Sequence, residues 1–159
     1  MKPKYASNGL KVLLILFGVG VAFVGVYVLP IMALQMTEAY PEIAYAKTPI
    51  LIISELLLIL LLIGIATILY LLKVFDKGKT FTSDFTKGLT ALVLMCLVAA
   101  LGVFGIFMYT SSLGGPDPLS ALIMIGAIFV ILIVGSVILL VKTIVKESIT
   151  YKTDYDLTV

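Results

Sequence analysis

The stretch KVFDKGKTFTSDFTK, residues 73–87, is the only long polar interval with an apolar run of membrane-spanning length on each side. It divides the chain into two halves, and each half contains two such runs. The sequence therefore predicts two helical hairpins. The polar interval joins them and sets the side of the membrane from which both enter.

The composition of the whole chain agrees with this division. Hydrophobic residues make up 62% of the 159 residues and charged residues 13%, a balance that cannot be divided between a core and a water-facing surface. We therefore predict an all-α integral membrane protein with one four-helix transmembrane domain. The predicted transmembrane helices are at about residues 10–34, 49–72, 88–109 and 119–141, followed by a tail at 142–159.

The distribution of lysine predicts the orientation. All eleven basic residues are Lys, and ten of them lie before or at the threshold of the first span, within residues 73–87, or after the fourth span. Lys47 alone lies on the other side. By the positive-inside rule, both termini and the 73–87 loop are expected in the cytoplasm. The net charge of +2 is too small and too dispersed to indicate direct nucleic-acid binding.

The residues needed for most catalytic and metal sites are missing from the sequence. It contains no His, its single cysteine is Cys96, and no span carries paired carboxylates. The segment Lys77-Gly78-Lys79-Thr80 lacks the upstream glycine of a phosphate-binding loop. We therefore expect no enzyme, no cofactor and no metal site.

One full charge falls inside a predicted span. Glu55 lies six residues after Pro49, about 9 Å along a helix. It either faces the bundle interior and binds a proton or ligand, or lies at the outer rim, solvated or hydrogen-bonded to a neighbouring helix. Small residues at helical spacing predict close helix contacts in other spans, at Gly18, Ala22 and Gly25 and at the pair Gly102 and Gly105.

The 73–87 loop contains a candidate interfacial segment. Phe81, Phe85, Leu89 and Leu92 recur at helical spacing, which favours an amphipathic turn at the membrane surface. Gly78 would allow the chain to reverse before it. The alternative is a solvated loop that only sets orientation. The candidate residues are Lys77, Gly78, Lys79, Phe81 and Phe85.

The spacing of the apolar residues changes within the tail. Helical spacing continues about two turns past the fourth span, but from Thr150 apolar and polar residues alternate, as in a strand. A lone strand needs a sheet edge. We expect it to pair with a cytoplasmic partner or with a second copy of the chain as a homo-oligomer, whereas the alternative is a disordered tail. The candidate contact residues are Tyr155, Asp156, Leu157, Thr158 and Val159.

The loop motif Asp76-Lys77-Gly78-Lys79-Thr80-Phe81-Thr82 and the ending Asp156-Leu157-Thr158-Val159 carry a family resemblance, together with Pro30 and Pro41-Glu42. On these residues the chain resembles the bacterial membrane proteins of domain of unknown function 2975. The resemblance implies four spans in a bacterial cell membrane and no assigned activity. It also implies a small helix-turn-helix regulator of the Cro/C1 type, encoded nearby, as a partner.

Two functional hypotheses follow. The first is a non-enzymatic regulatory protein that binds a cytoplasmic partner through its polar cytoplasmic segments. The second is a small transport or immunity component that works through the membrane interior, based on Glu55 and the small-residue helix faces.

Overall fold

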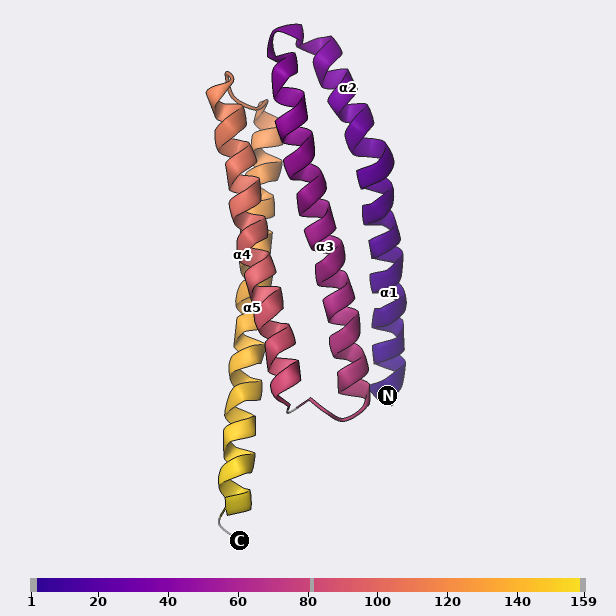
Figure 1. Ribbon diagram of the computed structural model, residues 1–159, viewed down its shortest axis with the longest axis vertical. Coiled ribbons are helices and arrows are strands. Elements are labelled where there is room, and N and C mark those ends of the chain that lie inside the picture. Colours follow the sequence, from indigo (N-terminus) through magenta and orange to yellow (C-terminus); the bar gives the residue numbers. More distant parts are fainter. Residues whose placement is uncertain (1–2, 81, 158–159) are drawn as a thin grey trace.

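The computed structural model describes residues 3–80 and 82–157 and is helical almost throughout (Figure 1). The first helical segment consists of α1 (Pro3–Phe23), a π-helical turn η1 (Val24–Val28) and α2 (Leu29–Ala39). A 3₁₀ turn, η2 (Pro41–Ala46), leads into α3 (Lys47–Asp76). The second half contains α4 (Ser83–Ser112) and α5 (Pro118–Leu157). The described part of the chain contains no strand, and the expected all-α class is confirmed.

Four helical segments are long and apolar enough to cross a membrane. They cover Ser7–Ala39, Pro41–Asp76, Ser83–Ser112 and Pro118–Tyr151, with mean hydropathies between 2.7 and 3.1. Each segment contains one of the four predicted spans. Large apolar side chains face outward along them, such as Leu122 and Ile133 on α5, both more than 60% exposed. Such a surface suits hydrocarbon better than water.

The helices form two hairpins, α1–α2 with α3 and α4 with α5 (Figure 1). The main contacts join α1 and α2 to α3, α3 to α4, and α4 to α5, the last pair being the most extensive. We call the end that holds the α3–α4 connection the loop end, and the end that holds residues 40–46 and 113–117 the turn end. α1 begins and α5 finishes at the loop end, as the predicted four-span topology requires.

The helix ends at the α3–α4 connection follow from local sequence. Gly78 adopts a φ of +68°, a conformation that suits glycine, and its N–H donates to the Phe75 carbonyl at 2.9 Å. The Lys79 N–H donates to the Val74 carbonyl at 3.2 Å, which completes a Schellman cap on α3. Thr82 then caps α4 by accepting from the Phe85 N–H at 3.5 Å. The predicted chain reversal at Gly78 is therefore confirmed.

The aromatic face that follows this reversal packs against protein. Phe85, Leu89 and Leu92 are 5–8% exposed and contact Leu71 of α3 and Val145 of α5. We call these five residues the loop-end core. The predicted amphipathic turn at the membrane surface is wrong for Phe85, because periodicity defines a helix face without defining what covers it. Phe81 lies outside the described residues.

The predicted terminal strand is also wrong within the described residues. α5 continues without interruption through Tyr155 and Asp156 to Leu157, and it extends beyond the loop end of the other helices (Figure 1). Adding residues to an existing helix requires no new nucleation, whereas a single strand leaves its backbone groups without partners. Thr158 and Val159 lie outside the described residues.

Glycine permits close contact at some of the predicted positions. A Cβ on Gly102 would lie 2.6 Å from Cδ2 of Leu57 on α3, whereas a Cβ on Gly105 would meet nothing within 4 Å. On α1, Gly18 approaches α3 near Ile65, but Ala22 is exposed. The π-helical turn buries Gly25, so the contact face of this segment is only partly the predicted one.

We expect Gly102→Leu to destabilise the protein by about 1–3 kcal/mol through overpacking of the α3–α4 contact. Gly105→Leu, one turn away on the same helix, is the matched control, and the open space around it predicts little loss. Reversible unfolding in mixed detergent micelles measures both variants. Equal losses at the two positions would contradict the packing described above.

Candidate functional site

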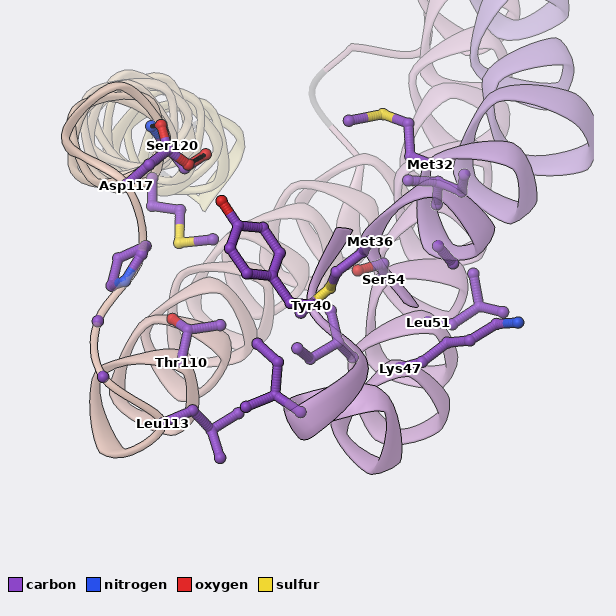
Figure 2. Close-up of a pocket in the computed structure, with 18 of the residues that line it drawn as sticks. Met32, Met36, Tyr40, Lys47, Leu51, Ser54, Thr110, Leu113, Asp117 and Ser120 are labelled. Carbon is purple, nitrogen blue, oxygen red and sulfur yellow. Dashed lines mark hydrogen bonds between the residues drawn. The ribbon is translucent and has the colours of Figure 1, made fainter. Parts of the chain in front are cut away.

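The turn end contains a cavity of about 760 Å³ between the two hairpins. One wall comes from α2, η2 and the start of α3, and the other from the α4–α5 turn and the start of α5 (Figure 2). Ligand pockets for small molecules commonly have volumes of about 300–1,000 Å³. The cavity is therefore large enough to hold a small organic molecule.

The walls of the cavity are largely apolar. Met32 and Met36 of α2 and Met124 of α5 line it from opposite hairpins, together with Leu29 and Leu51. Unbranched methionine side chains adapt to irregular shapes, and their sulfur atoms pack well on aromatic rings. This lining suits an apolar body whose shape does not have to be matched rigidly.

Two turns place the polar groups of the cavity. Tyr40 ends α2, with its N–H donating to the Met36 carbonyl at 3.0 Å, and its ring lies near the centre of the view in Figure 2. On the other hairpin, Gly114 and Gly115 adopt φ values of +113° and +90° in the turn between α4 and α5. This turn brings Asp117 to the cavity lining.

Asp117 occupies the N-terminus of α5. Its carboxylate accepts the Ser120 N–H at 3.1 Å and the Ser120 hydroxyl at 2.5 Å. The side-chain bond, followed by the backbone bond, lowers the pKa of Asp117 below its usual range. Asp117 is therefore charged at neutral pH. Glu42 and Lys47 also line the cavity, with the hydroxyls of Ser54 and Thr110.

Glu55 lies beside this cavity and not in its lining. It follows Ser54, which lines the cavity, and a carboxylate oxygen lies 3.3 Å from the position of a Cβ on Gly25. Glu55 lies on α3, about 12 Å along the helix from Lys47. Its side chain is partly buried against the π-helical turn η1. Among the described side chains, no hydrogen bond or ion pair to its carboxylate is found. The carboxylate therefore faces the neighbouring helix of its own hairpin.

The π-helical turn has a local cause next to Glu55. Pro30 has no N–H, so the carbonyl of Val26 cannot receive the usual helical hydrogen bond. The Leu29 N–H donates to the Val24 carbonyl, five residues back, and not to the Gly25 carbonyl four residues back. The helix then continues to Ala39. The helix therefore does not end at Pro30. Single π-helical turns are frequent at functional sites.

The other predicted site residues lie at the loop end. Lys77 and Gly78 end α3, and Lys79 completes its cap. An ion pair between Lys11 of α1 and Asp76 of α3 ties the first hairpin together at this end, and the sequence patterns did not predict it. The backbone of the tail residues Tyr155, Asp156 and Leu157 extends α5 away from the cavity. The structure therefore separates the cavity and the tail by the length of the bundle.

In the parts of the chain that the structure describes, no three His, Cys, Asp or Glu side chains group as metal ligands. The cavity instead combines an apolar lining with a few charged and hydroxyl groups, the usual pattern for reversible binding of a small molecule.

Four apolar helices with a cavity between two hairpins indicate a multi-pass helical membrane protein. The chain belongs to the family described as protein of unknown function DUF2975, whose model matches residues 31–159. This match confirms the resemblance drawn from the loop and tail motifs. No curated protein and no solved structure matches the chain.

Proposed function

We propose that this protein is a non-enzymatic membrane regulator that takes a small molecule in the turn-end cavity and binds a cytoplasmic partner through the end of α5. The lysine distribution supports an orientation with the turn end outside and the loop end in the cytoplasm. Lys73, Lys77, Lys79 and Lys87 lie at or near the α3–α4 connection, whereas Lys47 starts α3 at the turn end.

One observation carries the proposal: the two hairpins line a cavity together at the turn end and pack against each other through the Gly102–Leu57 contact and the loop-end core. A molecule that contacts both walls would shift one hairpin against the other at the turn end, with these packed contacts as the pivot. α5 is one helix of 40 residues, about 60 Å long. A change in its tilt at Pro118 therefore moves its far end.

The partner to test is the small helix-turn-helix regulator that the family resemblance implies. Because α5 is helical through residue 157, we expect docking to depend on this helix and not on strand pairing. Asp154→Pro should unwind the last turns, since proline costs about 3 kcal/mol inside a helix. Asp154→Ala favours the helix and is the matched control.

We expect co-purification of the regulator to fall to background in Asp154→Pro and in a deletion of residues 152–159, and to remain near the unmodified level in Asp154→Ala. Membrane insertion should be equal in all variants, because the changes lie beyond the candidate span that ends at Tyr151. Full retention of the regulator by the proline variant would overturn the proposed docking.

A transport component is the second candidate function. The observation that favours it is the position of Glu55 beside the cavity, against the π-helical turn at Gly25. The same tail deletion separates the two functions. A transporter would keep solute movement in proteoliposomes without residues 152–159, whereas a regulator of the proposed kind would lose its partner.

A further inference from the structure

We propose that the turn-end cavity selects a small organic cation with an apolar body, such as a quaternary ammonium carrying an aromatic or alkyl group. This inference rests on the proposed ligand-binding role and specifies the chemistry of the ligand.

The charge of the lining favours a cation. The cavity has two carboxylates, Asp117 and Glu42, and one ammonium group, Lys47. Lys47 extends from α3 on the side of the cavity away from Asp117 and Ser120 (Figure 2). The hydrogen bonds from Ser120 keep Asp117 ionised. Its negative charge attracts a quaternary ammonium, which has no N–H and therefore needs no free acceptor position on the carboxylate.

The same hydrogen bonds disfavour an anion. The N-terminus of a helix attracts anions because its first N–H groups lack helical partners. At the start of α5, the carboxylate of Asp117 already takes this position by accepting from the Ser120 N–H. A second anion would meet an ionised carboxylate there, so the usual route to anion binding at this end of the cavity is occupied.

The aromatic ring of Tyr40 provides a face that can bind a cation. Tyr40 is 55% exposed, and its ring lies between the Asp117–Ser120 side of the cavity and the Met36–Ser54 side (Figure 2). The face of an aromatic ring attracts ammonium groups, which the carboxylates would also favour. Met32, Met36 and Met124 line the rest of the cavity and would contact the apolar body of the same ligand.

The experiment measures binding of benzyltrimethylammonium to the purified full-length protein in lipid nanodiscs, by isothermal titration calorimetry. Benzylsulfonate, an anion with the same aromatic group, and neopentylbenzene, a neutral isostere of the cation, are tested as competitors. We expect saturable binding of the cation, no displacement by the anion, and displacement by the neutral compound only at much higher concentration.

Asp117→Asn removes the charge but keeps a side chain that caps helices about as well. We expect it to weaken cation binding by up to about fivefold, the upper end for an exposed ion pair. Tyr40→Leu should weaken binding about twofold to fivefold through loss of the cation–π contact. Glu38→Gln is the matched control, because Glu38 lies on α2 at the same end but outside the cavity lining.

Equal weakening in Asp117→Asn and Glu38→Gln would overturn the proposal, because it would show a general surface charge effect. Binding of the anion or the neutral compound as tightly as the cation would also overturn it. Absence of cation binding in nanodiscs when the same titration in detergent shows it would overturn the proposal as well, because lipid would then occupy the cavity. If the cation fails to bind while Asp154→Pro still releases the regulator, the ligand class is wrong and the proposed regulatory function stands.

Discussion

Phe85→Ala should lower the free energy of unfolding by about 3 kcal/mol, the low end for a buried phenylalanine, because helix association in lipid depends on packing more than on transfer from water. Phe85 is 8% exposed and contacts the rest of the loop-end core. Its removal leaves a cavity where α3, α4 and α5 meet. No other aromatic side chain belongs to this core among the described residues.

Phe129→Ala is the matched control. Phe129 lies on α5 and is 63% exposed, in a stretch of the helix whose apolar side chains face outward. Lipid can fill the space that its ring leaves, so we expect a change within about 0.5 kcal/mol, as for other surface positions. Reversible unfolding in mixed detergent micelles compares the two. A loss at Phe129 as large as that at Phe85 would show that the loop-end core does not hold the hairpins together.

The helices and their ends were largely predictable from the sequence. Apolar runs of sufficient length defined the four spans, and Gly78 marked a chain reversal that does occur with positive φ. These features depend on neighbouring residues, so local patterns contain the information. The same reasoning located Glu55 within a span, but not its contact with Gly25, which depends on how η1 and α3 are rotated against each other.

The cavity could not be predicted, because it depends on contacts between distant segments. Met36 and Tyr40 come from the first hairpin and Asp117 and Met124 from the second, and no local pattern specifies how hairpins pack. The tail was misread for a related reason: its alternating residues resemble a strand, but the helix that precedes them determines their conformation.

The second prediction with a large effect concerns which parts of the protein are accessible to water. The account requires an open cavity on the outer side and a closed core near the inner side. Single cysteines introduced in a Cys96→Ala background can test both requirements. Met36→Cys and Met124→Cys place one thiol on each wall of the cavity, and Leu89→Cys places one in the loop-end core, where Leu89 is 6% exposed.

Tyr151→Cys reports the opposite side, because Tyr151 is 69% exposed on α5 at the loop end. The positive-inside rule predicts a cytoplasmic position for it. A membrane-impermeant maleimide should therefore reach it only in permeabilised cells. Leu89→Cys should remain unreactive in both conditions, since the packing around it excludes water-soluble reagents.

The most direct measurement is the reaction of these cysteines with the impermeant maleimide in intact and in permeabilised cells. The account predicts that Met36→Cys and Met124→Cys are labelled nearly completely in intact cells, and that Tyr151→Cys is labelled only after permeabilisation. Labelling of Tyr151→Cys in intact cells would contradict the orientation. Cavity cysteines that stay unreactive on both sides would contradict the open outer cavity on which the proposed function depends.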